Sequence, residues 1–372
     1  MVEHGIDVLR VAGSNPASRT KIMITLGIET SCDETALCLL ETQEKDGVFE
    51  YRVLGNIVHS QIDIHKEYGG VFPMLAKREH IKNLPILYEK ILQEARTSEK
   101  QIGKIAVTRG PGLEPALWTG ILFAQELGKK LGIPVIPINH MEGHILGSLL
   151  SKSESHIEFH KLLPVEFPAL AVLISGGHTE IVKMEKIGEY KVLGATVDDA
   201  IGEAFDKVAR MLGLTYPGGP EISKLAEKAR KSNLEKKIKL PRPMLHSKDL
   251  KFSFSGLKTA VLYTLRELGD ISDEQKLDLA REFEDAVTEV LISKTKSAIE
   301  EEGPKTLIIG GGVIANKHIR LAFEKLANEH SITLYMPVNG LSGDNALMIT
   351  IVGAIKPREG SLGFKAEGNL SL

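Results

Sequence analysis

The sequence predicts an α/β protein made of two duplicated lobes with a nucleotide-binding cleft between them. The chain has 372 residues, of which 42% are hydrophobic, and this length exceeds what one hydrophobic core usually organises. Its 35 glycines and its low aromatic content of 5% suit an α/β enzyme with many glycine-shaped turns. A ββ-β-α-β-α pattern also occurs twice along the chain. Lobes duplicated in this way bring equivalent loops together, so the cleft is where we expect chemistry.

Four pairs of matching segments define the repeat. Each half begins with a β-hairpin of alternating apolar and polar residues, followed by a strand that carries Val-Leu-Gly. The next strand leads into a glycine turn and a helix. A last strand then leads into the final helix. The pairs are, in order, 24–40 with 170–184, 53–55 with 192–194, 105–112 with 306–312, and 134–150 with 332–355. One pair could arise in any α/β chain, whereas four pairs in the same order indicate duplication.

The repeat sets the expected domain boundaries. Residues 1–22 lack clear periodicity, so we expect a non-native or disordered extension, with Met23 as the functional start. The first lobe is expected over 23–150, a linker over 151–167, and the second lobe over 168–345, with a helical insertion at about 221–270. Residues 346–372 are expected to form a C-terminal helix and tail.

Composition limits the compartment and the class of partner. The two cysteines, Cys32 and Cys38, match neither a redox pair nor a four-ligand zinc site, which favours a reducing compartment. No apolar run approaches the ~20 residues of a membrane span and no cleaved signal is evident, so a cytoplasmic protein is expected. The net charge of −3 does not by itself attract nucleic acid, so RNA binding would need a local cationic segment such as 224–242. Such a run is more often an exposed helix face.

His140 and His144 form the strongest candidate metal site. Four residues apart at the start of a predicted helix, they lie on one face and can reach one ion. An isolated pair with this spacing is equally often just a polar helix face, but the equivalent segment of the second half supplies Asp344. Two histidines and one carboxylate leave open positions on iron or zinc. A metalloprotease is disfavoured, because Met141 stands where the general-base glutamate would follow the first histidine and Glu142 comes one residue later.

Glycine turns offer candidate phosphate sites. Backbone N–H groups can approach phosphate oxygens closely at 110–112, 175–179 and 310–312, while the acidic turn 29–34 takes the fourth equivalent place. Each turn alone is more often only structural, and none matches the P-loop or dinucleotide patterns. Their placement in two equivalent halves resembles the superfamily of actin, heat-shock chaperone ATPases and sugar kinases, in which two lobes grip a nucleotide.

Ten motifs follow one another from Met23 to nearly the end of the chain. They are GIETSCDETA (27–36), YGGVFPMLAKREH (68–80), GPGL (110–113), NHMEGH (139–144), LISGGHTE (173–180), DDAIGEAFDKVARMLGL (198–214), YPGGP (216–220), FSFSGLKTA (252–260), GGGVIAN (310–316) and GDNALM (343–348). In this order they resemble one family, the bacterial TsaD and archaeal or eukaryotic Kae tRNA threonylcarbamoyladenosine transferases. His178, and Leu173 in place of a tyrosine ligand of archaeal relatives, make the resemblance bacterial.

The resemblance implies a site and a reaction. His140, His144 and Asp344 would be the metal ligands, with Fe²⁺ favoured over Zn²⁺. The residues implied to contact threonylcarbamoyl-AMP or an adenine nucleotide are Leu173, Ile174, Ser175, Gly176, Gly177, Asp206, Gly219 and Asn316. The family transfers the threonylcarbamoyl group to N6 of the adenosine 3′ of the anticodon in tRNAs that read ANN codons, and AMP leaves. Asp33 and Glu34, on the first hairpin turn, are our candidates for proton acceptance.

The resemblance also implies partners, and it leaves alternatives. Besides tRNA, a TsaB-like paralogue and a TsaE-like ATPase are expected, and relatives commonly carry a short arginine-bearing tail beyond the equivalent of Leu372. The alternatives are an ATP-dependent kinase or ATPase of the same fold, and a non-catalytic nucleotide-binding scaffold. Kinases of this fold do not need a two-histidine metal site, and a scaffold would be expected to lose the ligands, so the transferase is favoured.

Overall fold

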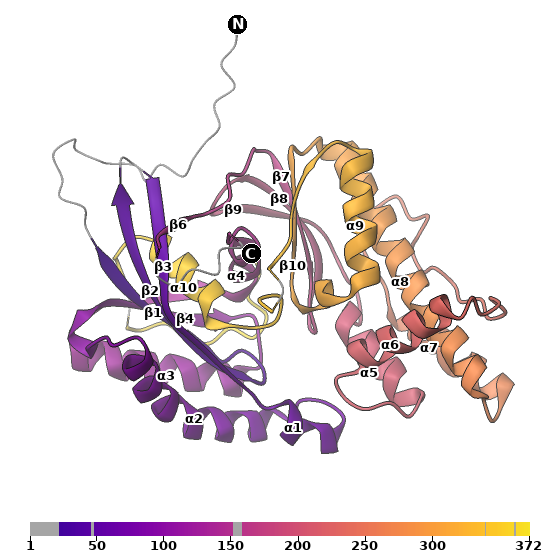
Figure 1. Ribbon diagram of the computed structural model, residues 1–372, viewed down its shortest axis with the longest axis horizontal. Coiled ribbons are helices and arrows are strands. Elements are labelled where there is room, and N and C mark those ends of the chain that lie inside the picture. Colours follow the sequence, from indigo (N-terminus) through magenta and orange to yellow (C-terminus); the bar gives the residue numbers. More distant parts are fainter. Residues whose placement is uncertain (1–21, 46–47, 152–157, 339, 361) are drawn as a thin grey trace, which may run out of the picture. The chain divides into compact units, whose positions relative to one another are not determined.

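The computed structural model describes residues 22–45, 48–151, 158–338, 340–360 and 362–372 as two compact α/β units (Figure 1). Unit 1 comprises the described residues up to Asp63 together with 71–166 and 337–372. Unit 2 comprises 64–70 and 167–336. The predicted extension, residues 1–22, lies outside the described residues except for Ile22.

Unit 1 is organised around a sheet whose described strands follow the order β5-β4-β1-β2-β3-β6. The strands are β1 (Met23–Glu29), β2 (Glu34–Lys45), β3 (Val48–Ser60), β4 (Ile102–Gly110), β5 (Val135–Asn139) and β6 (His160–Lys161). β1 pairs antiparallel with β2 and parallel with β4, and β4 pairs parallel with β5. β1 is buried from Ile24 to Glu29, as expected for a central strand covered on both faces.

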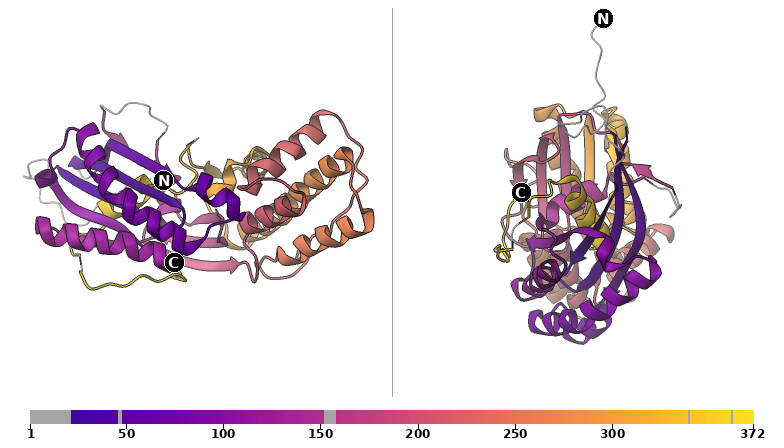
Figure 2. Two further views of the ribbon diagram at one scale, coloured as in Figure 1. Left: turned by 90° about the horizontal axis from the view of Figure 1, so that it is seen from below. Right: turned by 90° about the vertical axis from the view of Figure 1, so that its left-hand side faces the viewer.

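Helices cover both faces of this sheet (Figure 2). The helices of unit 1 are α2 (Pro73–Glu94), α3 (Glu114–Leu131), α4 (His140–Gly147) and α10 (Ala346–Ile355). Leu26 and Ile28 of β1 belong to a core that includes α2 and α3. Gly27, between them, lies against α10, because side chains of a strand alternate between its two faces. α10 is apolar along nearly its whole length and contacts β1, β2, β4 and α4.

Unit 2 repeats the strand order of unit 1. Its described sheet runs β11-β10-β7-β8-β9, which matches β5-β4-β1-β2-β3 strand for strand. The strands are β7 (Ala169–Ile174), β8 (Thr179–Lys186), β9 (Glu189–Ala195), β10 (Thr306–Gly310) and β11 (Thr333–Tyr335). β7 pairs antiparallel with β8 and parallel with β10, just as β1 pairs with β2 and β4. The repeat expected from four matched segments is therefore present in the topology.

Unit 2 contains a larger set of helices than unit 1. These are the short α1 (Ile62–His65), which begins in unit 1, and α5 (Ile201–Met211), α6 (Gly218–Lys231), α7 (Ser255–Leu268), α8 (Asp273–Glu302) and α9 (Lys317–Glu329). Phe205 of α5 and Phe283 of α8 meet edge to face with ring centroids 5.1 Å apart in the core. α6 and α7 occupy the region where an insertion is expected.

The structure differs from the expected boundaries in two places. The chain returns to unit 1 at Pro337, so Asp344 belongs to unit 1 and not to the second lobe. The cause is α10, whose apolar residues are buried by packing against the first sheet and α4. The expected linker also contains β6, which adds an edge strand to β3 at Tyr51 and Glu50.

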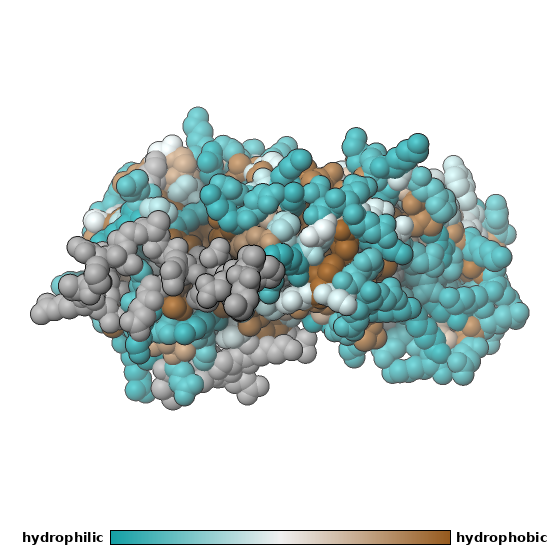
Figure 3. All heavy atoms as spheres, turned by 90° about the horizontal axis from the view of Figure 1, so that it is seen from above, coloured by the Kyte–Doolittle hydropathy of each residue, from teal (hydrophilic) through white to brown (hydrophobic). Residues whose placement is uncertain are grey.

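None of the described helices is long and apolar enough to cross a membrane. On the face drawn in Figure 3, hydrophilic residues predominate and hydrophobic residues form separate patches.

Candidate metal and substrate site

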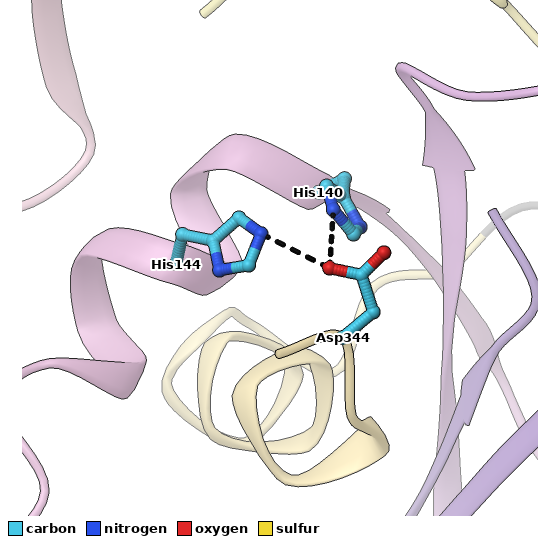
Figure 4. A group of neighbouring side chains, drawn as sticks. All are labelled: His140, His144 and Asp344. Atoms are coloured by element: carbon cyan, nitrogen blue, oxygen red, sulfur yellow. Dashed lines mark ion pairs between the residues drawn. The ribbon is translucent and has the colours of Figure 1, made fainter. Parts of the chain in front are cut away.

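Three predicted ligands meet within unit 1 (Figure 4). His140 and His144 project from successive turns of α4, and Asp344 lies just before α10. The Nε2 atoms of His140 and His144 lie 3.4 Å and 3.3 Å from the same carboxylate oxygen, Asp344 Oδ1. One potential ligand atom of each residue lies within 4.8 Å of the other two. The structure thus brings the three predicted ligand side chains to one place.

Capping and close helix packing fix this geometry. Asn139 caps α4 by accepting from the amide of Met141 at 2.8 Å, and Asn345 caps α10 by accepting from the amide of Met348 at 3.1 Å. Asn139 is next to His140 and Asn345 is next to Asp344, so the two caps fix the backbone beside these predicted ligands. A Cβ on Gly143 would come within 3.0 Å of Ile349, so the absence of a side chain there lets α4 approach α10 closely.

The cluster fits a divalent metal. Donor–metal distances of about 2.1 Å and a donor separation near 3.3–3.4 Å correspond to an angle of roughly 105°, between octahedral and tetrahedral geometry. His144 Nε2 is buried and makes no hydrogen bond to the described residues, although it lies at ion-pair distance from Asp344. A buried ring nitrogen without a hydrogen bond is costly, and coordination would satisfy it.

Charge is concentrated at this cluster. Burial raises the pKa of Asp344, but the adjacent imidazoles of His140 and His144 outweigh burial and hold it well below its usual range. Burial lowers the pKa of His140, yet Asp344 and Glu29 outweigh it and raise that pKa well above its usual value. The side chain of Asp344 is 22% exposed, whereas those of His140 and His144 are almost fully buried. A substrate would therefore reach an ion at this site from the side of Asp344, because the two histidines are buried.

The acidic turn between β1 and β2 is held by a buried histidine that sequence reasoning did not single out. His80 of α2 contacts the Cys32 carbonyl at 3.0 Å through Nε2 and the Thr35 hydroxyl at 2.8 Å through Nδ1. The amide of Gln61 donates to the Asp33 carbonyl at 3.0 Å. The only sequence signal for His80 is its place at the end of the motif YGGVFPMLAKREH.

Asp33 and Glu34 lie on this turn in different environments. Asp33 is buried, and Glu34 opens β2 with partial exposure. Burial, reinforced by the charge of Asp33, raises the pKa of Glu34 well above its usual value. The neutral acid form of Glu34 therefore persists to a higher pH than that of an ordinary glutamate.

Two of the predicted phosphate turns lie side by side in unit 2. The turn 175–179 follows β7, the turn 310–312 follows β10, and the two strands pair in register at Leu173 and Gly310. The first turn is closed by the amide of Ser175 donating to the His178 carbonyl at 2.9 Å. A Cβ on Gly176, Gly177 or Gly312 would meet no atom within 4 Å beyond its chain neighbours, so there is open space beside these three residues.

Other predicted contact residues serve the fold as well. The side chains of Leu173 and Ile174 are fully buried in β7, so only their backbone atoms are available to a ligand. Asp206 accepts from the amide of Gly218 at 2.7 Å, at the start of α6, and lines a cavity of about 230 Å³. The cavity is also lined by Lys66, Arg210, Thr215 and Tyr216.

Asn316 and Gly219 stand at helix starts in the same unit. Asn316 caps α9 by accepting from the amide of Ile319 at 3.1 Å, and its own amide donates to Glu284 at 2.6 Å. Gly219 lies in the first turn of α6, where the nearest contact to an added Cβ would be Phe205 at 4.0 Å. The side chain of Asn316 is oriented by two hydrogen bonds.

The third predicted phosphate turn, 110–112, is used differently. The amide of Gly112 donates to the Gly368 carbonyl at 3.0 Å, and a Cβ on Gly110 would come within 1.9 Å of the Glu367 carbonyl oxygen. The C-terminal segment thus lies against this turn and occupies the place of an anion. The prediction of a phosphate site there is wrong, because sequence pattern does not show which distant segment packs on a turn.

The cationic run 224–242 is largely paired within the protein. Arg230 contacts Glu284 and Asp285 of α8, Lys236 also contacts Asp285, and Arg242 contacts α8 through Glu282 and Glu289. Lys224, Lys231 and Lys237 pair with neighbouring glutamates. Across the described ranges, Lys228 and Lys239 are left without an ion pair. Most of the cations that could contact RNA are therefore paired within unit 2, and Arg230, Lys236 and Arg242 join the run to α8.

Comparison with known proteins decides the family. The family model for TsaD, tRNA N6-adenosine threonylcarbamoyltransferase, matches residues 52–351. The chain is 46% identical over 331 residues to the tRNA N6-adenosine threonylcarbamoyltransferase of Thermosipho africanus, covering 89% of this chain and 93% of that one. It is 44% identical to the enzyme of the same name from Aromatoleum aromaticum, covering 92% and 93%. The chain belongs to the tRNA N6-adenosine threonylcarbamoyltransferase family.

Solved structures agree on the fold. T. kodakarensis HypF is similar with a TM-score of 0.54 at 13% identity, and the match covers 89% of this chain and 47% of HypF. Full-length HypF in its phosphate- and nucleotide-bound form gives a TM-score of 0.52 at 14% identity, covering 91% and 47%. The predicted α/β class with two duplicated sheets is confirmed. The prediction of a tRNA-modifying transferase is confirmed by the family, and the kinase, ATPase and scaffold alternatives gain no support.

Proposed function

We propose that this chain transfers the threonylcarbamoyl group of threonylcarbamoyl-AMP to N6 of the adenosine 3′ of the anticodon, in tRNAs that read ANN codons. The adenosine amine attacks the carbamoyl carbon, the bond from that carbon to the phosphate oxygen breaks, AMP leaves, and the amine loses one proton. Membership of the family supports the reaction. The observation that carries it is the meeting of His140, His144 and Asp344.

We propose that Nε2 of His140, Nε2 of His144 and a carboxylate oxygen of Asp344 hold one divalent metal, Fe²⁺ in preference to Zn²⁺. The two imidazoles and one carboxylate leave positions open, and this set of ligands is common in iron sites. When bound, such an ion would polarise and orient an oxygen of the donor. The protein supplies the fixed ligand geometry through the caps of α4 and α10.

The chain's own groups place the donor in this proposal. The amides of Gly176, Gly177 and Gly312 supply hydrogen bonds to the phosphate of the adenylate, with Leu173, Ile174 and Ser175 contributing through the same strand and turn. Asp206, Gly219 and Asn316 hold the nucleoside, since a carboxylate and an amide can pair with ribose hydroxyls and base edges. An exocyclic amine is a weak nucleophile, so positioning supplies most of the rate enhancement.

The acidic turn provides the proposed proton acceptor. Asp33 is the better candidate, because the raised pKa of Glu34 favours its neutral form. Glu34 would instead donate a hydrogen bond to the substrate. An Asp33→Asn variant should lose turnover while retaining donor binding, whereas a Glu34→Gln variant should lose less.

Partner proteins are also proposed. A TsaB-like paralogue would dock on α2, where Met74 and Ile81 lie seven residues apart on one helix face and are each more than half exposed. A TsaE-like ATPase and a synthase that makes the adenylate are the other proposed partners. Within the described residues, no surface singles out the ATPase.

The test is reconstitution of the modification. Unmodified tRNA, threonine, bicarbonate and ATP are incubated with the chain and its partners, and the nucleosides are analysed by mass. Threonylcarbamoyladenosine should form with the wild-type chain and with His59→Ala, a control at an exposed histidine of unit 1. It should be nearly absent with Asp344→Ala. Absence of product with the wild type, when the same partners work with a known transferase, rejects the proposed function.

A further inference from the structure

Glu29 contacts His140 on the ring nitrogen that does not face Asp344. Glu29 is the last residue of β1 and is fully buried. Its Oε2 lies 2.9 Å from His140 Nδ1, while the opposite nitrogen, Nε2, points to Asp344 Oδ1 at 3.4 Å. The imidazole is thus held between two carboxylates, one on each ring nitrogen.

We infer that Glu29 is the positioning residue that makes His140 a metal ligand, by accepting the Nδ1 proton and leaving the Nε2 lone pair directed at the ion. In a neutral imidazole one nitrogen donates and the other accepts, and the partner of the first decides which is free. The inference rests on the proposed metal site. Neither the family's implied ligands nor the acidic pair Asp33 and Glu34 includes this residue.

The carboxylate of Glu29 is itself fixed. The hydroxyl of Thr108 donates to Oε2 at 2.7 Å, and the amide of Ser31 donates to Oε1. Thr108 stands beside Glu29 because β1 and β4 pair in parallel, with Ile28 opposite Val107. Three donors, from α4, β4 and the turn after β1, therefore converge on one buried carboxylate, and a glutamine could not accept all three as well.

Strand alternation places Glu29 on the correct side of the sheet. Gly27 faces α10, so Glu29, two residues further along β1, faces the same side. Ile28 faces the opposite core with α2 and α3. Glu29 is therefore the last residue of β1 on the face toward α10, and from there its side chain reaches His140 of α4.

The Ser31 hydroxyl is the competing partner of His140. It lies 3.3 Å from Nδ1, longer and weaker than the carboxylate contact at 2.9 Å. A neutral hydroxyl can also donate to Nδ1, which would move the ring proton to Nε2 and block coordination. The charge of Glu29 selects the opposite tautomer.

The test measures Co²⁺ affinity of the purified full-length chain by titration, followed by the visible absorption of the bound ion. Glu29→Gln should bind Co²⁺ about 10–100-fold more weakly than the wild type, with an altered spectrum, because partners of this kind contribute to that degree. Thr108→Val should lie between the two, and Ser31→Ala should stay within about twofold of the wild type.

Glu41→Gln is the matched control. Glu41 is a nearly buried carboxylate of the same sheet, paired with Arg52, and it stands opposite Ile24 at the other end of β1. It should bind Co²⁺ as the wild type does even if its stability falls. Circular dichroism on each variant shows whether the fold is retained, and Thr108→Val gives a second reading if Glu29→Gln fails to fold.

The outcomes separate the inference from the proposed function. If the wild type and Glu41→Gln bind Co²⁺ but folded Glu29→Gln binds it equally tightly with the same spectrum, the inference is overturned and the metal site stands. If the wild type does not bind Co²⁺, the proposed metal site itself is rejected, and the inference falls with it.

Discussion

Replacing Gly27 with alanine should displace α10 and with it Asp344. A Cβ at Gly27 would come within 1.8 Å of the Thr350 hydroxyl and 2.8 Å of the Ala346 carbonyl oxygen. The threonine can change rotamer, but the backbone oxygen can move only if the first turn of α10 moves. Asp344 stands two residues before Ala346, so it would move with that turn.

The expected magnitude follows from overpacking. An added methyl group in a tight core costs about 1–3 kcal/mol of unfolding free energy. If displacement of Asp344 costs about 1.4 kcal/mol of the metal-binding free energy, metal affinity falls roughly tenfold. Thermal and urea unfolding measure the first quantity, and Co²⁺ titration measures the second.

Gly103→Ala is the matched control on the same sheet. Its added Cβ would meet chiefly the flexible end of Met23, at 2.2 Å from the sulfur, so a side-chain rotation relieves the contact. It should be nearly as stable as the wild type and should bind metal equally well. If Gly27→Ala matches the wild type in both stability and metal affinity, the docking of α10 does not set the position of Asp344.

Three other outcomes are expected. Arg230→Ala should destabilise the protein by about 3–5 kcal/mol in urea unfolding, because it leaves fully buried Glu284 without its cation, whereas Lys231→Ala on the surface should change stability by less than about 1 kcal/mol. Burial raises the pKa of Asp285, but hydrogen bonds from a histidine, a lysine and an arginine outweigh it and lower that pKa below 3.8. Its contribution to stability is therefore present above about pH 3.8 and is lost as pH falls below it, so Asp285→Asn should show a weaker acid dependence below pH 4 in unfolding curves. Removing metal with a chelator should lower the melting temperature of the wild type. Metal at a hundredfold its Kd adds about 2.7 kcal/mol to the free energy of unfolding, and the chelator removes this contribution. It should leave Asp344→Ala unchanged, and equal shifts in both proteins would contradict the proposed site.

The sequence predicted the repeat because strand alternation and glycine turns are local signals. The two hairpins, at 24–40 and 170–184, are visible from alternation alone, and their equivalent places fix the strand order of both sheets. The spacing of His140 and His144 likewise follows from helical periodicity. These features depend on residues that are close together in the chain, so they can be read from the sequence alone.

The remainder depends on distant packing, which local pattern does not record. The amide of Gly112 donates to the carbonyl of Gly368, which lies more than 250 residues further along the chain. The pairing of Arg230 with Glu284 could not be read from the charge run, because Glu284 lies 54 residues beyond Arg230. Glu29 appeared only as part of an acidic turn, and its direction toward His140 became evident once β1, β4 and α4 were placed together.

The most direct test of the central claim is anomalous diffraction from crystals of the full-length chain grown with Fe²⁺ under anaerobic conditions. One anomalous peak is predicted about 2.0–2.3 Å from His140 Nε2, His144 Nε2 and a carboxylate oxygen of Asp344. A fully loaded crystal with its peak elsewhere, or with these three side chains uncoordinated, would contradict the account.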